Sequence, residues 1–426
     1  MSDLAAYPSD LSPVPAPTRN PIFFGPNGLR AGWGLLLFAL LLGILFMIFD
    51  AATQIQHLTH PSAEFLKNPF FTPKIQLAEA VFYMLAVVFG AILLGRGTDF
   101  PQGKATLTLI LLLVSVFLIT NAIVHVVHLQ HEKTAAAAAQ GKPEAKPATP
   151  VSAPAANSTK QELGAAGSEA VTFGLVLLVT WIMSRIEHRP FGQYGLGGNS
   201  RRWPQFAKGL VSGFAALSLL ILGLYLGHWI TFNGFLLHTA SAVVSNGLLW
   251  FLAFLMVGFF EEFMFRGYLQ FTLARGIGFG AVGFFISAAI FNFSFGFAHS
   301  SNPGESPIGL VTAGLIGFVF CISLWYTRSL WWAIGFHATW DWGESYFYGT
   351  ADSGGVSQGR LLDTHPQGKL LLSGGPTGPE GSALCLVIIV LIAVWVWYSL
   401  RNERNKSTNQ ALVNPIDTTQ APLLDT

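Results

Sequence analysis

Long apolar segments recur along this chain, and they limit its fold more than any other feature of the sequence. They cover residues 33–49, 75–95, 105–127, 170–183 and 209–230, a run from 247 through two adjacent glutamates, a run ending at His299, residues 308–326, a run around His337 and residues 383–400. About 20 apolar residues in a helix cross the hydrocarbon core of a membrane, so the pattern predicts an all-α, polytopic bundle of about ten spans. With 52% hydrophobic and 11% charged residues among 426, the composition excludes a large soluble domain. A net charge of +1 offers no basic surface for nucleic acid.

Three charges stand at the end of one apolar run, in the segment Gly258–Gly267 (GFFEEFMFRG). An ionised side chain at membrane depth costs several kcal/mol unless it is paired or lines a polar cavity. Glu262 and Arg266 are four positions apart, on one helix face where they can pair. Glu261 is rotated by roughly 100° from Glu262 and cannot share that pair at good geometry. We therefore predict that Glu262 and Arg266 form a structural pair and that Glu261 faces something else.

The chain downstream supplies polar partners at matching depth. His299 ends the next apolar run, and His337 and Asp341 lie four positions apart within a later one. At ~1.5 Å per residue, Glu261 lies about 22 Å before the glycine-rich turn at 276–280, and His299 about 28 Å after it. His337 lies about 12 Å beyond a later turn near residue 328. We predict that Glu261, His299, His337 and Asp341 converge on one site.

These motifs, in this order, resemble those of a known family. Glu-Glu-x-x-x-Arg, Phe-x-x-x-His and His-x-x-x-Asp on successive membrane helices are similar to the motifs of the CPBP (CAAX protease and bacteriocin-processing, or Abi) intramembrane proteases. The family includes the prenyl-protein endopeptidases, and the resemblance covers roughly Gly209–Tyr346. It implies that Glu261 activates water and that His299 assists. It further implies that His337 and Asp341 hold the oxyanion and that Glu262 and Arg266 are structural.

Asp341 departs from the pattern of the prenyl-endopeptidase branch, which usually has asparagine there. An ionised aspartate accepts hydrogen bonds and repels negative charge, so it stabilises an oxyanion poorly. Three roles are therefore open to Asp341: it is protonated, it orients His337, or it binds a metal. We predict that it fixes the tautomer of His337 from behind, so that His337 alone faces the oxyanion.

Three other functions use the same residues. Glu261, His299, His337 and Asp341 are a plausible ligand set for Zn²⁺, which would make the chain a zinc metalloprotease. The sequence contains no His-Glu-x-x-His motif, and we expect metal-free catalysis without a cofactor. A transporter could use the carboxylates as a proton relay. A non-catalytic membrane scaffold could retain the site without activity.

The organisation of the chain follows from composition and charge. We expect a disordered cytoplasmic tail at 1–28, a transmembrane module at 29–189 with a low-complexity loop at 132–168, a protease core at 190–400, and a disordered cytoplasmic tail at 401–426. Within the core we expect a short interfacial helix in 231–246 and a Gly/Pro-rich loop at 347–381. The basic loops favour a plasma (inner) membrane protein with both termini in the cytoplasm. Its expected partners are the bilayer and a peptide or protein substrate.

Overall fold

The computed structural model describes residues 24–25, 28–57, 155–197, 202–278, 280–302 and 304–403. The chain separates into two compact units, residues 1–147 and 148–426. In the first unit, β1 (Phe24–Gly25) pairs antiparallel with β2 (Gly28–Leu29), ahead of helix α1 (Ala31–His57). The tail predicted to extend through residue 28 is therefore wrong at its end. The spans predicted at 75–95 and 105–127 and the tail from 404 onward lie outside the described residues.

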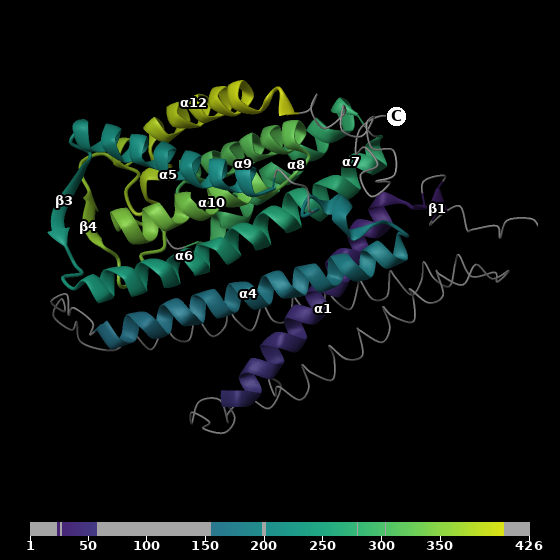
Figure 1. The fold of residues 1–426 in the computed structure, drawn as a ribbon, viewed down its shortest axis with the longest axis horizontal. Helices are drawn as coiled ribbons and strands as arrows, with labels where there is room; N and C mark the ends of the chain where they lie inside the picture. Colours follow the sequence, from purple (N-terminus) through teal and green to yellow (C-terminus); the bar gives the residue numbers. More distant parts are fainter. Residues whose placement is uncertain are drawn as a thin grey trace, which may run out of the picture. The chain divides into compact units, whose positions relative to one another are not determined.

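The second unit is built predominantly of helices, which confirms the predicted fold class (Figure 1). Its helices are α4 (Ala155–Ile186), α5 (Arg202–Leu226), α6 (Ala240–Glu262), α7 (Phe271–Ile277), α8 (Ala281–Ala298), α9 (Pro307–Thr327), α10 (Trp331–Trp342), α11 (Leu370–Ser373) and α12 (Ala383–Leu400). Short 3₁₀ and π turns complete it: η2 (Phe191–Tyr194), η3 (Phe263–Gln270), η4 (His299–Ser301), η5 (Gly343–Tyr348) and η6 (Pro379–Gly381). The helix α4 lies along α6, and α10 packs against both α5 and α6.

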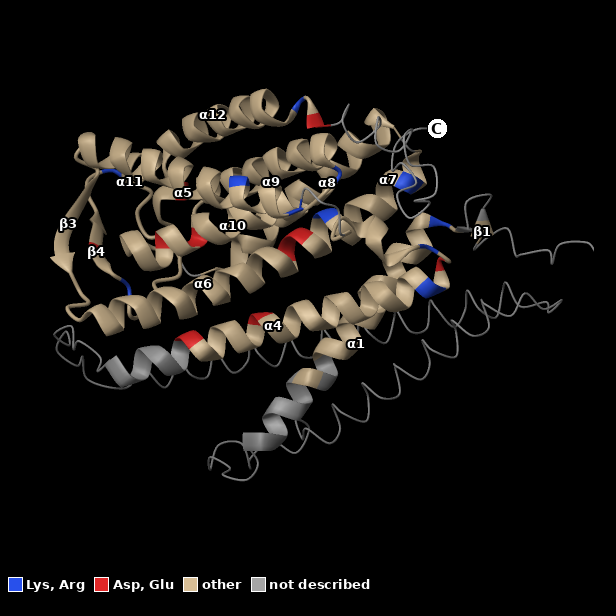
Figure 2. Ribbon diagram, viewed as in Figure 1, with Lys and Arg blue, Asp and Glu red and all other residues tan. Residues whose placement is uncertain are grey.

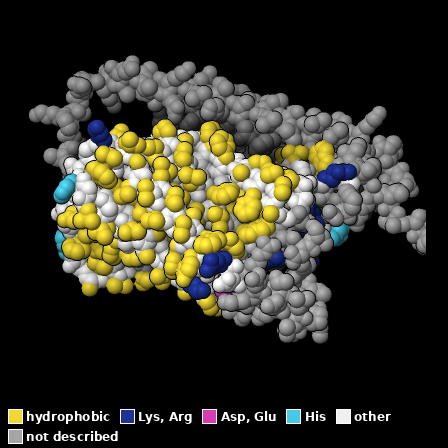
Figure 3. All heavy atoms as spheres, turned by 90° about the horizontal axis from the view of Figure 1, so that it is seen from above, with side chains coloured by type: hydrophobic (Ala, Val, Ile, Leu, Met, Phe, Trp, Pro, Cys, Tyr) yellow, Lys and Arg dark blue, Asp and Glu magenta, His cyan; other side chains and the backbone are white. Residues whose placement is uncertain are grey.

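Six helical segments of the described residues are long and apolar enough to cross a membrane. They are residues 162–186, 202–226, 240–277, 281–301, 307–327 and 383–400. Figure 2 shows few charged positions along these helices, and Figure 3 shows a face of the molecule covered largely by hydrophobic side chains. Among the described residues, large apolar side chains such as those of Val211 and Phe293 are exposed, as in a surface that contacts lipid. The chain is an integral membrane protein.

The segment predicted as the ninth span is instead a short internal helix. The helix α10 has 12 residues, which at ~1.5 Å each reach about 18 Å, less than the thickness of a hydrocarbon core of about 30 Å. Nearly all of it is buried, with Trp332, Phe336 and Trp340 packed into the main hydrophobic core. Its apolar residues therefore face other helices rather than lipid.

Close contact between α5 and α10 depends on glycine. A Cβ atom added to Gly209 would lie 2.1 Å from the carbonyl oxygen of Trp332, and one on Gly213 would lie 2.3 Å from that of Phe336. Small residues at such positions let helix backbones approach within membranes. Since His337 follows Phe336, this contact fixes the depth and rotation at which its side chain enters the bundle.

Two predicted segments end or fold differently. The low-complexity loop predicted at 132–168 already becomes helix α4 at Ala155, because alanine, glutamine, glutamate and leucine in 155–168 favour helix. The interfacial helix predicted in 231–246 is wrong. The first residues of this segment belong to strand β3 (Ile230–Phe235), which pairs antiparallel with β4 (Leu362–Pro366). Its last residues, from Ala240 onward, are the beginning of the long helix α6. The pairing partner lies about 130 residues further along the chain, where no local pattern reveals it.

Candidate active site

The two adjacent glutamates lie at the end of α6, where the helix widens into the π-helical turn η3. The side chain of Glu262 is fully buried, and its Oε1 accepts a hydrogen bond from Nη1 of Arg266 at 3.0 Å. The predicted pair is therefore present, with 1% of the Arg266 side chain exposed. Single π turns inside α-helices occur frequently at functional sites. Here the wide turn begins directly after the two carboxylates.

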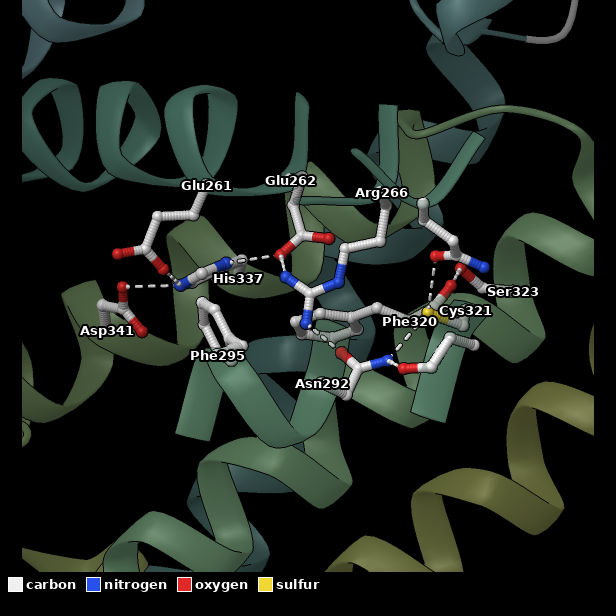
Figure 4. Close-up of polar contacts among 12 residues, drawn as sticks. Glu261, Glu262, Arg266, Asn292, Phe295, Phe320, Cys321, Ser323, His337 and Asp341 are labelled. Atoms are coloured by element: carbon white, nitrogen blue, oxygen red, sulfur yellow. Dashed lines mark hydrogen bonds and ion pairs between the residues drawn. The ribbon is translucent and has the colours of Figure 1, made fainter. Parts of the chain in front are cut away.

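Both terminal nitrogens of the Arg266 guanidinium are hydrogen-bonded, and an aromatic ring lies against its face. Its Nη2 donates to Oδ1 of Asn292 on α8 at 2.6 Å, and its Cζ lies 4.4 Å from the centre of the Phe295 ring (Figure 4). On α9, a Cβ added to Gly317 would lie 2.0 Å from Nη2 and 2.4 Å from Oδ1 of Asn292. Glycine is thus required at 317 for α9 to close over this pair. Three helices converge on one buried cation.

His337 on α10 lies among three carboxylates (Figure 4). Its Nδ1 lies 2.9 Å from Oε1 of Glu262, while its Nε2 lies 3.3 Å from Oδ2 of Asp341 and 3.6 Å from Oε2 of Glu261. The carboxylate of Glu262 also accepts from Arg266, so it is held as an acceptor and Nδ1 of His337 donates to it. A line of contacts therefore runs from Arg266 through Glu262 to His337.

The predicted position of Asp341 behind His337 is wrong. Glu262 occupies the rear of the imidazole, at Nδ1, whereas Asp341 and Glu261 both face Nε2. The residue expected to be only structural therefore fixes Nδ1 of His337 as a hydrogen-bond donor. The reason is geometric: Asp341 is one turn further along the same helix and reaches the ring from the side of the cavity.

His299 follows α8 in the 3₁₀ turn η4. Its Nδ1 lies 2.8 Å from the carbonyl oxygen of Phe295. A carbonyl oxygen only accepts, so Nδ1 carries the hydrogen, and in the neutral ring Nε2 is left with a free lone pair. The histidine is thereby prepared to accept a hydrogen bond from water or to take up a proton.

One cavity of about 220 Å³ joins the four predicted site residues, Glu261, His299, His337 and Asp341. Glu261 and Asp341 retain 20% and 12% exposure of their side chains. Apolar side chains form much of the remaining wall: Phe254, Val257, Phe295, Ala313, Ile316, Phe320 and Trp340. The cavity therefore places two carboxylates and two imidazoles beside a surface suited to an apolar ligand.

The cavity also contains residues that sequence reasoning missed. Asp352, Ser353 and Glu380 line it, although they belong to the segment predicted only as a Gly/Pro-rich loop. Within the described ranges, the residues predicted as a zinc site do not bring three donor atoms within 4.8 Å of one another, whereas Glu344, Asp352 and Glu380 do. No helical spacing links these three, and their shared acidic character is the only signal in the sequence.

Comparison with known protein families supports the resemblance predicted from the motifs. Residues 243–343 match the family described as Type II CAAX prenyl endopeptidase Rce1-like. The matched segment contains the glutamate pair, both histidines and Asp341, and it confirms the family resemblance predicted from the three motifs. No curated protein and no solved structure matches the chain.

Proposed function

We propose that this chain, a membrane protein of the CAAX-type protease family, is an endopeptidase in which Glu261 activates water to attack a peptide carbonyl. Hydrolysis of a peptide bond requires a base for the water, a proton donor for the leaving amine and a group that stabilises the oxyanion. The observation that carries the proposal is the position of Glu261. Its carboxylate lines the cavity together with His299 and His337. The carboxylate of the adjacent Glu262 is instead buried, in contact with Arg266 and His337.

The other residues divide the remaining work. The free Nε2 of His299 orders the same water, and the proton taken by Glu261 is returned to the leaving amine. Glu262 accepts from the N–H at Nδ1 of His337, so Nε2 carries a hydrogen as well only in the imidazolium form, which the carboxylates of Glu261 and Asp341 favour. In this form the N–H at Nε2 faces the oxyanion. A substrate carbonyl then replaces the carboxylates of Glu261 and Asp341 as the partner of that N–H.

The substrate we favour is a peptide that carries a lipid near its C-terminus. The aromatic and aliphatic wall around Phe254, Ile316 and Trp340 suits a prenyl chain beside the reacting carbonyl. In the test, the purified protein in lipid nanodiscs receives a farnesylated peptide ending Cys-a-a-X, the same peptide without farnesyl, and an unmodified transmembrane peptide. We expect release of the terminal tripeptide from the farnesylated peptide alone. Cleavage of the transmembrane peptide instead would overturn the substrate class, and failure to cleave any of the three would overturn the proposed protease.

Substitutions of His337 and Asp341 are expected to have very different effects on the rate of cleavage. His337→Ala should lower the rate of cleavage by about 10²–10³, the usual cost of losing one oxyanion donor. Asp341→Asn should keep the rate near that of the wild type or raise it, since an amide can donate to the oxyanion and does not repel it. The measurement is the initial rate of cleavage by both variants and the wild type, after thermal unfolding has established that all three proteins are equally stable. Complete inactivation of Asp341→Asn together with loss of bound metal would favour the zinc mechanism.

Withdrawal of zinc is expected to leave activity unchanged. The test is incubation with a zinc-selective chelator while Ca²⁺ and Mg²⁺ are kept in excess, followed by the peptide assay and by elemental analysis of the purified protein. Our account expects less than stoichiometric zinc and the same rate before and after treatment. Loss of activity that added zinc restores would instead make Glu261, His299, His337 and Asp341 ligands.

A further inference from the structure

A second group of carboxylates lies beyond the proposed catalytic residues. Glu344 in η5, Asp352 in the loop that follows and Glu380 in η6 place one oxygen each within 4.8 Å of one another. Glu344 is fully buried, and Asp352 and Glu380 line the cavity from the loop side. None of the three pairs with a lysine, arginine or histidine in the part of the chain that the structure describes.

Glu344 is the observation that points to a ligand. Both of its carboxylate oxygens are buried without a hydrogen-bond partner among the described residues, although its backbone carbonyl accepts from the amide and the hydroxyl of Thr350. A buried polar group without a partner costs about 1–3 kcal/mol, and more if it is charged. Protonation would remove the charge of Glu344 but would leave its oxygens unpartnered. A bound cation would both neutralise the charge of Glu344 and give its oxygens a partner.

The other two carboxylates are held in place by donors that engage one oxygen each. The hydroxyl of Ser345 donates to Oδ2 of Asp352 at 2.9 Å, and the amide and hydroxyl of Ser353 both donate to Oε1 of Glu380, the hydroxyl at 2.8 Å. Such outer contacts orient the ligands of a metal ion. A Cβ on Gly378 would lie 2.2 Å from the carbonyl oxygen of Ala351, so a glycine at 378 is what lets the two loop segments meet.

We infer that Glu344, Asp352 and Glu380 bind one hard divalent cation, such as Ca²⁺ or Mg²⁺, which fastens the loop wall of the cavity to the end of α10. Three carboxylates offer only oxygen ligands, which these cations prefer over the nitrogen and sulfur ligands favoured by zinc. This role is structural and independent of the proposed chemistry at Glu261. Burial and the neighbouring acids raise the pKa of Glu380 to about 8 and that of Asp352 well above its ordinary value. A bound cation would relieve this mutual repulsion of the carboxylates.

Direct binding to the full chain in nanodiscs tests this inference. Equilibrium dialysis with Ca²⁺ and, separately, with Mg²⁺ measures bound ion per chain, and thermal unfolding is followed at constant ionic strength. We expect one bound ion per chain and an unfolding temperature that rises with the cation and then saturates. Asp352→Asn and Glu380→Gln should each weaken binding at least about 10-fold.

A matched control is available in strand β4, which lies between Asp352 and Glu380 in the chain. Asp363→Asn also removes one negative charge, but Asp363 pairs with Arg360 outside the cluster, so it should bind the cation as the wild type does. Absence of a stoichiometric ion from the wild type at millimolar Ca²⁺ and Mg²⁺ would overturn the inference. So would wild-type affinity in both Asp352→Asn and Glu380→Gln. Neither readout requires activity, so failure of the proposed protease and failure of this site are distinguishable.

Discussion

Replacing Glu262 with glutamine is expected to lower the free energy of unfolding by about 3–5 kcal/mol, the usual cost of removing one partner of a buried ion pair. The side chain is fully buried and its Oε1 serves both Arg266 and His337, at 3.0 and 2.9 Å. An amide can still accept one of these hydrogen bonds, but it cannot neutralise the guanidinium. Denaturant titration of the purified protein measures the loss, and the peptide assay should show a reduced rate in the fraction that folds.

Glu169→Gln is the matched control for this prediction. Glu169 also lies in a membrane-spanning helix, α4, but it is only half-buried, and it forms no ion pair within the described residues. Its replacement should change the free energy of unfolding by much less. If Glu262→Gln proved as stable as Glu169→Gln, the line of contacts from Arg266 to His337 would not support the site, and our account of it would be wrong.

Local helix geometry made part of this site predictable. A spacing of four positions predicted the contact between Glu262 and Arg266, and it also brings Asp341 to the ring of His337. Counting helical rise from each turn was enough to predict that Glu261 and His299 reach the same depth, and they line one cavity. These inferences work because a membrane helix is long, regular and confined to one direction.

Contacts between distant segments could not be predicted in the same way. Glu262 and His337 are 75 positions apart, and their contact depends on the rotation of α10 against α6, which the apolar pattern does not specify. The turn of the chain after Tyr348 carries Asp352 to the cavity and returns Glu380 beside it, through glycine-dependent contacts rather than periodic ones. The short length of α10 was likewise hidden, because a helix buried by protein and one buried by lipid are equally apolar.

Replacing Glu261 with glutamine is expected to reduce hydrolysis by about 10²–10⁴, the range that general-base catalysis supplies. Only a carboxylate can take the proton from water, and glutamine has nearly the same shape. The fold should persist, because the side chain of Glu261 is 20% exposed in the cavity and its ion-pair contact, with His337, is long at 3.6 Å. The same substitution is thus expected to have different main effects at the two adjacent positions: loss of activity with the fold retained at Glu261, and loss of stability at Glu262.

The most direct measurement is a single-turnover cleavage assay of the wild type and Glu261→Gln in nanodiscs, performed in ¹⁸O-labelled water with the farnesylated peptide. Thermal unfolding of both proteins, measured beforehand, establishes that they are equally folded. Our account predicts that the wild type yields a new carboxyl group containing one oxygen from the solvent, and that Glu261→Gln yields almost none in the same time. An equally folded Glu261→Gln protein that cleaved the peptide at the wild-type rate would contradict the assignment of Glu261 as the base.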